Sequence, residues 1–307
     1  MSVLINLNQT EIPLNEVEVT LEHLESRLMI DILQKVITLS KTNSNVVISG
    51  EAGTGKEWIA KLICQLDCEN YNYLAHLSFD HLKLEDLQEN VFQEMALELN
   101  KDAEPNKIAL IIDNFSDLEP IGQLNLISKL IKFRDQSDIE SVRFIFIVQK
   151  EWLKGASNNL VWPYICELLN PVSILIPPLR EHREDIIPLV GLFIAQHQKS
   201  FDFNETGEAI QISDQALYKC INYEWPGNLR QLKNAITHAC YSKKGEIIQP
   251  EDLPISIDVS HLYTDQNVAF RNLSFQNAER QLIKRKSHKK GNFVVDNIHK
   301  IIGYLTN

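Results

Sequence analysis

Short apolar runs alternate with amphipathic stretches along the first half of the chain. Runs rich in β-branched and aromatic residues predict strands at residues 46–48, 73–79, 108–112 and 142–148. Apolar residues at helical spacing predict helices at residues 21–39, 58–66, 84–99 and 123–133. Strands that alternate with helices in this way form a parallel sheet buried on both faces. The pattern therefore predicts an α/β fold.

The later part of the chain shows helical periodicity with little sign of strands. Amphipathic patterns predict helices at residues 185–196, 213–221 and 228–241. Ser213 is expected to cap the second of these helices, and Pro226 and Asn228 mark the start of the third. We therefore expect a small helical region after the sheet.

A glycine-rich segment joins the strand at residues 46–48 to the helix that follows it. Its spacing is the G-x-x-x-x-G-K of a phosphate-binding loop, with the residues Gly50, Glu51, Ala52, Gly53, Thr54, Gly55 and Lys56. Glycines let backbone N–H groups converge on phosphate oxygens, and the helix N-terminus and Lys56 add positive charge. An accidental glycine-rich turn is the alternative, and the strand-loop-helix context argues against it. The segment predicts a nucleoside triphosphate site, with ATP as the expected ligand.

Two further positions bear on a magnesium ion beside that nucleotide. Glu57 stands where most phosphate loops place a Ser or Thr that ligates Mg²⁺. Asp113 ends the apolar strand at residues 108–112, at the edge of the sheet where ligands bind in open α/β folds. We expect Asp113 to hold Mg²⁺, the alternative being a solvent-facing carboxylate at the end of a core strand.

Composition and charge narrow the class of protein. The 307 residues are 44% hydrophobic and 23% charged, as expected for a soluble chain with two domains and a tail. No apolar run is long enough to span a bilayer and the first residues lack signal-peptide features, so we expect a cytoplasmic protein without a membrane partner. A net charge of −11 argues against broad electrostatic attachment to nucleic acid. The five scattered cysteines are expected to be reduced and mostly buried.

Four segments, in order, resemble the AAA+ domain of sigma-54-dependent transcriptional activators. The matching family motifs are GESGTGKE at residues 50–57, DEIGDL at 113–118, LPPLRERREDI at 176–186 and WPGNVREL at 225–232. The resemblance implies a bacterial protein with an AAA+ P-loop parallel sheet flanked by helices, followed by a small all-α lid domain. The expected division is an N-terminal extension at 1–20, a nucleotide domain at 21–180, a lid at 181–255 and a C-terminal tail at 256–307.

The same resemblance implies that Arg230 reaches the γ-phosphate of the nucleotide. An arginine in the first turn of a helix is unfavourable to the helix dipole unless an anion lies nearby. The alternative is a surface arginine paired with a neighbouring carboxylate.

Several positions depart from the family at the places that hydrolyse ATP and use its energy. Asn114 replaces the catalytic Glu, and an amide cannot accept a proton from the attacking water. Val148 and Gln149 replace a polar Thr-Asn pair, and Trp162 and Leu168 stand where two arginine fingers are expected. Arg134 and Arg143 carry no sequence signal that assigns them this role. Residues 93–100 contain no GAFTGA loop, so contact with sigma-54 is not expected.

The tail offers a second candidate contact. Too few residues follow a predicted helix at 298–302 to form a DNA recognition helix. The basic run at residues 284–290 is a candidate contact for DNA or an acidic partner, with a solvated face as the alternative.

These observations predict a degenerate AAA+ protein that binds ATP and Mg²⁺ but hydrolyses ATP poorly. We expect it to regulate transcription through nucleotide-dependent assembly, as a ring subunit with itself or with another AAA+ activator. Two alternatives stay open. One is an active ATPase motor completed by a partner's arginine, and the other is a DNA-binding transcription factor that acts without sigma-54.

Overall fold

The computed structural model describes residues 3–6, 24–66, 73–79, 107–136, 141–154, 161–200 and 210–255. These residues fall into two compact units. The first contains residues 3–6, 27–182 and 225–231, and the second contains residues 24–26, 183–224 and 232–255.

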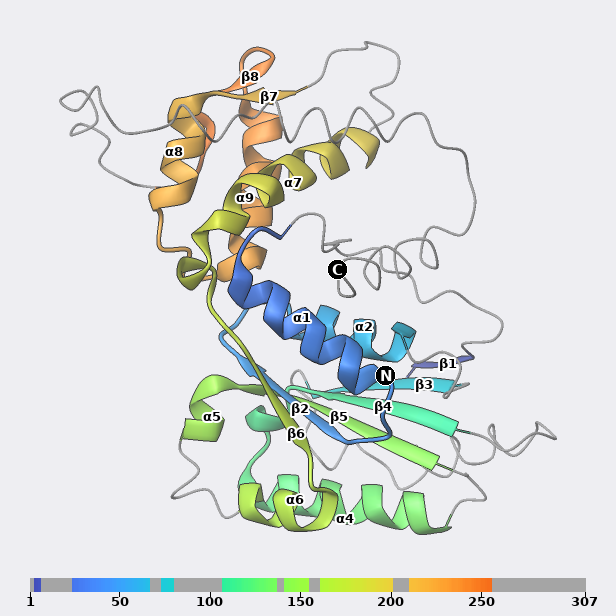
Figure 1. Cartoon of the computed structure of the whole chain (residues 1–307). Coiled ribbons are helices and arrows are strands. Elements are labelled where there is room, and N and C mark those ends of the chain that lie inside the picture. Colours follow the sequence, from blue (N-terminus) through green and yellow to red (C-terminus); the bar gives the residue numbers. More distant parts are fainter. Residues whose placement is uncertain are drawn as a thin grey trace. The chain divides into compact units, whose positions relative to one another are not determined.

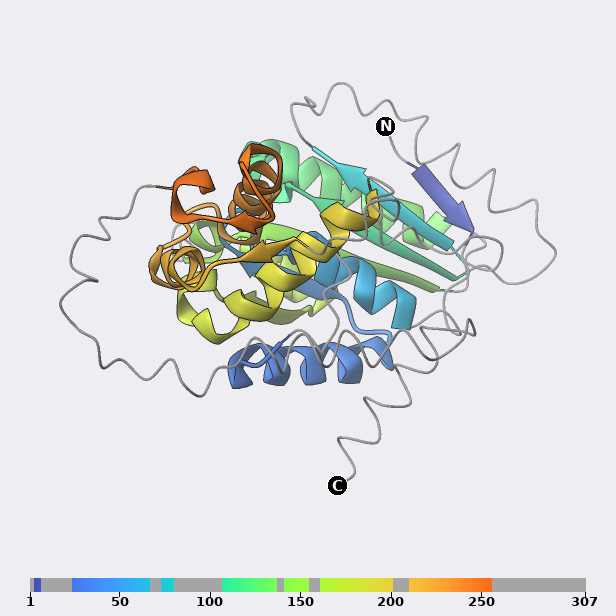
Figure 2. The ribbon, with the colours of Figure 1, turned by 90° about the horizontal axis from the view of Figure 1, so that it is seen from above.

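A six-stranded sheet forms the centre of the first unit (Figure 1). In spatial order its strands are β1 (Val3–Asn6), β3 (Tyr73–Ser78), β4 (Lys107–Asp113), β5 (Ser141–Gln149), β2 (Val46–Gly50) and β6 (Val172–Ile176). The five strands from β2 to β6 run parallel, which confirms the predicted sheet. β1 pairs antiparallel with β3 at one edge (Figure 2), and neither β1 nor β6 was predicted from the sequence.

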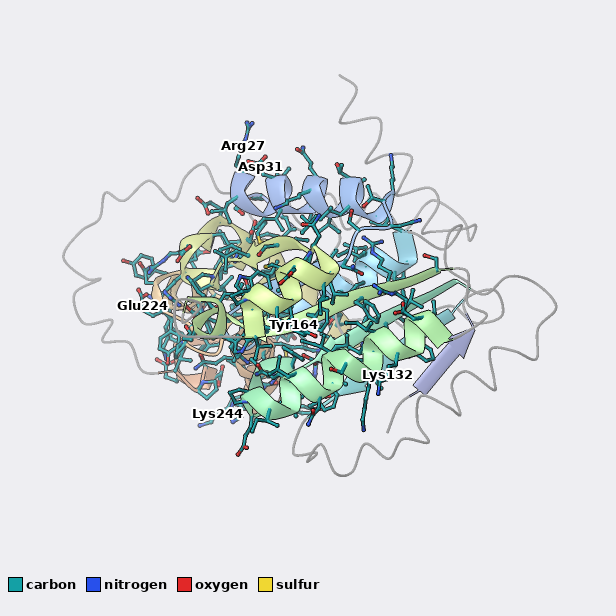
Figure 3. All side chains as sticks on the ribbon, turned by 90° about the horizontal axis from the view of Figure 1, so that it is seen from below. Arg27, Asp31, Lys132, Tyr164, Glu224 and Lys244 are labelled. Carbon is teal, nitrogen blue, oxygen red and sulfur yellow. The ribbon has the colours of Figure 1, made fainter. Side chains whose placement is uncertain are left out.

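Helices cover both faces of this sheet (Figure 1). They are α1 (Arg27–Ser40), α2 (Lys56–Leu66), α4 (Pro120–Gln136), α5 (Lys150–Lys154) and α6 (Val161–Leu169). α1 and α2 lie on one face, and α4 and α6 lie side by side on the other, with Tyr164 and Lys132 on their outer surfaces (Figure 3). Apolar side chains of α4 and α6 pack on the sheet around the fully buried Phe115, Phe144 and Phe146. This packing holds the strands in place and so determines the positions of their carboxyl ends.

The helix predicted at residues 21–39 begins later than the apolar pattern suggested. α1 starts at Arg27, and its buried face carries Met29, Leu33 and Val36, whereas Leu28 is 41% exposed. In the second unit, Asp185 Oδ1 accepts hydrogen bonds from the backbone N–H groups of Glu25 (2.6 Å) and Ser26 (2.8 Å). These bonds hold the chain in a non-helical conformation just before the helix, which the spacing of apolar residues does not reveal.

The second unit is largely helical. Its elements are η6 (Arg183–Asp185), α7 (Ile186–Ser200), β7 (Gln211–Ile212), α8 (Asp214–Asn222), the part of α9 (Asn228–Ser242) after residue 231, β8 (Ile247–Ile248) and η8 (Pro250–Asp252). All three predicted helices are present. Ser213 Oγ accepts a hydrogen bond from the Ala216 N–H, which confirms the predicted cap of α8. Buried Lys219 ties α8 to η8 by donating to the carbonyl oxygen of Pro250 at 2.7 Å.

Four of the five cysteines lie in the part of the chain that the structure describes. Cys64, Cys220 and Cys240 are buried, Cys166 is half-buried, and none of the four forms a disulfide. Burial raises the pKa of Cys220 to about 12 and that of Cys240 to about 11, so both thiols are neutral at physiological pH.

Some predictions concern segments outside the described ranges. These are the helix at 84–99, the missing GAFTGA loop at 93–100, the basic run at 284–290 and the helix at 298–302. Among the helices that are described, none is long and apolar enough to cross a membrane.

Candidate functional site

The glycine-rich loop runs from the end of β2 to the first residue of α2. Gly53 has a φ of 77° and Gly55 a φ of 90°, a region that residues with a side chain rarely adopt. A Cβ atom on Gly53 would lie 2.3 Å from the carbonyl oxygen of Gly227, so this point of the loop also has no space for a side chain. α2 opens directly from the loop, and the unpaired N–H groups of its first turn are the usual donors to a bound anion.

Lys56 is 8% exposed although it carries a charge. Its Nζ atom donates hydrogen bonds to the carbonyl oxygens of Gly50 at 3.0 Å and Glu51 at 2.7 Å. Burial lowers the pKa of Lys56, the carboxylate of Asp113 opposes this shift, and the guanidinium of Arg230 adds to it. The ammonium group therefore lies within the curve of the loop, in surroundings that favour a compensating anion.

An ion pair holds the loop. Arg180 donates from Nη1 to Glu51 Oε2 at 2.8 Å and from Nη2 to Glu51 Oε1 at 2.6 Å. Hydrogen bonding from Arg180 lowers the pKa of Glu51 to about 2, although burial acts in the opposite direction. Glu51 is therefore ionised throughout the physiological range, and its carboxylate is held by Arg180.

Asn228, the first residue of α9, also holds the loop. Its Nδ2 donates to the carbonyl oxygen of Ala52 at 2.9 Å and lies 3.5 Å from Glu51 Oε2. Its Oδ1 accepts from the Leu179 N–H at 2.9 Å. Asn228 is fully buried and has a φ of 51°, a left-handed conformation that Asn adopts more readily than most residues. The asparagine thus fixes the loop, the segment after β6 and the start of α9 to one another.

Asp113 lies at the carboxyl edge of the sheet, two strands away from the loop. Its side chain is 15% exposed, and its Oδ1 accepts a hydrogen bond from the Asn114 N–H at 2.8 Å. His76 Nε2 lies 4.0 Å from Asp113 Oδ2. Because β4, β5 and β2 are neighbours and parallel, the ends of all three strands meet at this edge. The carboxylate is placed where a cation beside a bound phosphate would be expected.

Glu57 lies in the first turn of α2 with a carboxylate in place of a hydroxyl. Its Oε1 accepts from Lys61 Nζ at 2.8 Å and lies 3.9 Å from His76 Nδ1. Burial raises the pKa of Glu57, but the hydrogen bond from Lys61 and the charges of Lys61, His76 and Arg230 outweigh it and lower the pKa overall. This carboxylate is already engaged by Lys61, so Asp113 is the better candidate for a cation ligand.

Arg230 lies beside the loop through its backbone, and its charge acts on Glu57 and Lys56. Its N–H donates to the carbonyl oxygen of Gly53 at 3.3 Å, so the residue lies beside the loop. The residue is exposed, and no hydrogen bond or ion pair of its guanidinium occurs within the described part of the chain. The sequence left open that Arg230 pairs with a neighbouring carboxylate. No such pair is seen among the described residues. The structure therefore places the backbone of Arg230 beside the loop.

The structure shows the surroundings of the positions that depart from the family motifs. Asn114 has a φ of 56°, a backbone conformation better suited to Asn than to Glu. Gln149 ends β5 opposite Gly50, and its N–H donates to Ser116 Oγ. Trp162 packs edge-on against Trp152, with ring centroids 5.8 Å apart, and Leu168 is 38% exposed on α6.

Two arginines considered as replacements for the missing fingers are committed elsewhere. Arg143 is 1% exposed, and it donates to the carbonyl oxygens of Ser44 and Leu39, both at 2.9 Å. It lies near the amino end of β5, away from the edge that carries the glycine loop. Arg134 pairs with the adjacent Asp135 on an exposed surface of α4. Neither residue reaches the glycine loop of its own chain.

Three residues of the site had no role in the site expected from the sequence, where Asn228 was expected only to mark the start of a helix. Arg180 and Asn228 lay inside recognised motifs, but their partners are far away in sequence. His76 lay in a predicted strand with no motif around it, and only its place on the sheet brings it beside Asp113. Within the described ranges no group of three His, Cys, Asp or Glu side chains could by itself hold a metal ion.

Comparisons with known proteins agree with this architecture. A family model described as the sigma-54 interaction domain matches residues 25–179, about half of the chain, and an AAA+ ATPase lid domain matches residues 180–269. A crystal structure of NtrX from Brucella abortus in complex with ATP has a TM-score of 0.58 at 21% identity, covering 86% of this chain and 60% of that chain. This likeness concerns the fold.

Curated relatives include transcriptional regulators. The chain is 28% identical over 249 residues to the transcriptional regulatory protein ZraR of Klebsiella oxytoca, covering 76% of this chain and 55% of the relative. It is 27% identical over 270 residues to the Nif-specific regulatory protein of Azospirillum brasilense, covering 80% of this chain and 40% of the relative. The chain spans about half the length of these relatives. The match to the family model, together with the sheet order and the glycine loop, shows that the chain belongs to the sigma-54 interaction domain family.

Proposed function

We propose that this protein binds ATP at the loop of residues 50–57. The observation that carries the proposal is Lys56, a buried ammonium group whose partners in the structure are two backbone carbonyls of a glycine-rich loop. A triphosphate at the loop would place anionic oxygens directly beside this buried charge. Arg230, with its backbone bonded to Gly53 and its guanidinium exposed, would reach the same phosphates.

A divalent cation fits beside this nucleotide. Asp113 Oδ1 is held by the Asn114 N–H, while Oδ2 faces His76 at a distance too long for a hydrogen bond. A carboxylate held in this way at the sheet edge is a suitable ligand for Mg²⁺, which commonly binds one or two carboxylates together with substrate phosphates. When bound, the cation would neutralise charge on the β- and γ-phosphates.

We further propose that hydrolysis is slow. The amide of Asn114 cannot take a proton from an attacking water, and neither Trp162 nor Leu168 carries charge to stabilise the transferring phosphoryl group. The loss of an arginine finger alone costs about 10³-fold to 10⁵-fold in rate. The protein would then respond to ATP by binding it rather than by consuming it.

Regulation of transcription is the proposed role of this nucleotide-bound state. Relatives that cover three quarters of the chain are named transcriptional regulatory proteins, which supports this assignment. The partner would be a second copy of the chain or an intact AAA+ activator, with the protein entering a ring as a subunit that binds ATP but does not use it. Contact with sigma-54 is not proposed, because residues 93–100 carry no GAFTGA sequence.

The test of this function measures ATP binding and phosphate release in one set of samples. The unmodified protein with ATP and Mg²⁺ is compared with Lys56→Ala, Asn114→Glu and the control Lys243→Ala. Lys243 lies in the second unit and donates to Gly245, so its removal leaves the loop intact. We expect binding to be lost in Lys56→Ala and kept in Lys243→Ala, with negligible release from the unmodified protein.

Two other outcomes would contradict the proposal in different ways. Rapid phosphate release by the unmodified protein would show an active motor. Equal binding by the unmodified protein and Lys56→Ala would show that the loop is not where ATP binds, and no binding by either would show that the protein does not bind ATP.

The assembly is tested separately by mixing the protein with an intact AAA+ activator from the same cell. We expect the activator's ATPase rate to change as the added protein replaces subunits, and the change to require ATP. An unchanged rate at every mixing ratio, with no complex on size-exclusion chromatography, would contradict the ring-subunit role.

A further inference from the structure

His76 occupies an unusual place between two carboxylates. Side chains alternate along β3, and Ala75 and Leu77 belong to the core packed against α4 and α6, so His76 is directed to the opposite face of the sheet. There its Nδ1 atom lies 3.9 Å from Glu57 Oε1, and its Nε2 atom lies 4.0 Å from Asp113 Oδ2. Both separations are longer than a hydrogen bond.

The Nε2 atom of His76 is buried and has no hydrogen-bond partner among the residues that the structure describes. Buried polar atoms are nearly always satisfied by protein, water or a ligand, so such an atom beside a proposed cation ligand requires an explanation. The facing Oδ2 atom belongs to the carboxylate whose other oxygen is already bonded to the Asn114 backbone.

The gap between these two atoms has the size that one cation can bridge. With the bond lengths of Zn²⁺ as a guide, about 2.0–2.2 Å to imidazole nitrogen and carboxylate oxygen, two ligand atoms are about 3 Å apart on adjacent positions of a cation and up to about 4.3 Å apart on opposite positions. The observed 4.0 Å therefore fits a cation that lies between the two atoms, with His76 and Asp113 on nearly opposite sides of it. Because no third protein ligand is present in the described ranges, the remaining positions would be filled by nucleotide phosphates and water.

We propose that His76 and Asp113 together ligate the divalent cation that accompanies the nucleotide, and that the imidazole makes this site favour Mn²⁺ over Mg²⁺. The inference rests on the proposed ATP site. Imidazole nitrogen is a good ligand for first-row transition cations, whereas Mg²⁺ strongly prefers oxygen. With a cation at Nε2, the ring proton is on Nδ1, where the Glu57 carboxylate faces it and Lys61 holds that carboxylate in place.

The experiment uses the full chain with ATP and Mn²⁺ and records the electron spin echo modulation of the bound Mn²⁺. A nitrogen ligand produces ¹⁴N modulation, which does not depend on hydrolysis. We expect this modulation in the unmodified protein, its loss in His76→Gln, and its persistence in His238→Gln. His238 is a matched control, because it lies in α9 and contacts Ser242 in the second unit.

A competition titration adds a quantitative reading. Mg²⁺ is added until half of the Mn²⁺ is displaced from the complex with ATP. We expect His76→Gln, which offers an amide oxygen, to lower the affinity for Mn²⁺ about tenfold or more while changing that for Mg²⁺ much less.

The results that would overturn the inference differ from those that would overturn the ATP site. If Mn²⁺ binds with ATP but shows no ¹⁴N modulation, or if His76→Gln leaves the modulation unchanged, His76 is not a ligand and the inference is wrong while ATP binding stands. If a fluorescent ATP analogue does not bind with either cation or without one, the proposed function is wrong and the cation site is lost with it.

Discussion

Arg180 and Glu51 form a two-pronged ion pair whose members lie 129 residues apart in the chain. Glu51 is the second residue of the glycine loop, and Arg180 lies three residues before the second unit begins. The pair therefore ties the conformation of the loop to the end of the segment that follows β6. Asn228, near the point where the chain leaves the first unit for the last time, is bonded to the same loop.

Arg180→Lys tests the two-pronged geometry without removing the charge. A lysine can form one of the two hydrogen bonds but not the planar pair, so we expect a loss of about 1 kcal/mol in the free energy of unfolding and ATP binding weakened several-fold. Urea denaturation and nucleotide titration measure the two effects. The control is Arg134→Lys, since Arg134 pairs with Asp135 on an exposed surface and the change is expected to stay within about 0.5 kcal/mol. Equal effects of the two substitutions would contradict a special role for Arg180.

The same pair predicts a dependence of stability on pH. Arg180 lowers the pKa of Glu51 from its ordinary value of 4.5 to about 2, so below pH 4.5 the unfolded chain takes up a proton that the folded chain resists. This contribution is fully present above pH 4.5 and is lost as the pH falls toward 2. Because both side chains remain partly exposed, we expect it to be about 1 kcal/mol.

The measurement compares the unmodified protein with Glu51→Gln by urea denaturation from neutral pH to about pH 3. The difference between the two proteins should shrink on acidification, since the glutamine variant lacks the titrating group. A difference that stays constant or grows at low pH would show that the ion pair does not set the stability of the loop.

The sheet could be predicted because most of its strands are continuous apolar runs, and each run can be identified from a few consecutive residues. The parts that were missed lack such a signal. β6 is an edge strand in which Leu175 is 50% exposed, and its burial pattern is that of a half-covered segment. α6 is a short helix with Pro163 in its first turn. Proline is tolerated there, but its presence in a sequence does not predict a helix. α1 begins at Arg27 because a side chain 159 residues away bonds the preceding backbone.

The candidate site also has a part that could be predicted from the sequence and a part that could not. The loop from Gly50 to Lys56 is contiguous, so its place between a strand and a helix and its glycine positions could be predicted from spacing alone. The residues that hold it are not contiguous with it, and Asn228 reaches Glu51 over 177 residues. The position of His76 beside Asp113 depends on the neighbouring strands β3 and β4. Spacing along the chain carries no information about such pairs, which exist only once the sheet has formed.

Asn228→Asp tests whether the buried amide is needed as a donor. Aspartate tolerates the left-handed backbone at this position and keeps the acceptor for the Leu179 N–H. It loses the hydrogen bond to the Ala52 carbonyl oxygen. It also places a buried carboxylate beside Glu51, since the Nδ2 atom that it replaces lies 3.5 Å from Glu51 Oε2. We expect a loss of about 2–3 kcal/mol in the free energy of unfolding and much weaker ATP binding.

The control for this change is Asn222→Asp. Asn222 is exposed and donates to the carbonyl oxygen of Tyr218 in α8, so the same substitution there should shift stability by no more than about 0.5 kcal/mol. A wild-type-like Asn228→Asp protein would show that the contacts of Asn228 contribute little.

Gly53→Ala and Gly191→Ala make the same chemical change with opposite expected effects. At Gly53 the new Cβ would lie 2.3 Å from the Gly227 carbonyl oxygen on a backbone with a φ of 77°, so the loop must rearrange. At Gly191, inside α7, the new Cβ has no atom of the described residues within 4 Å apart from its chain neighbours and the backbone of its own helix. Alanine there should add about 0.5–1 kcal/mol to the free energy of unfolding, since glycine is the poorer helix former.

The two variants are compared by thermal unfolding and by ATP titration. We expect Gly191→Ala to be more stable than the unmodified protein and to bind ATP equally well. We expect Gly53→Ala to be less stable and to bind ATP much more weakly. If Gly53→Ala binds ATP normally, the close approach of the loop to Gly227 is not required for the site, and the role assigned to the loop's conformation is wrong.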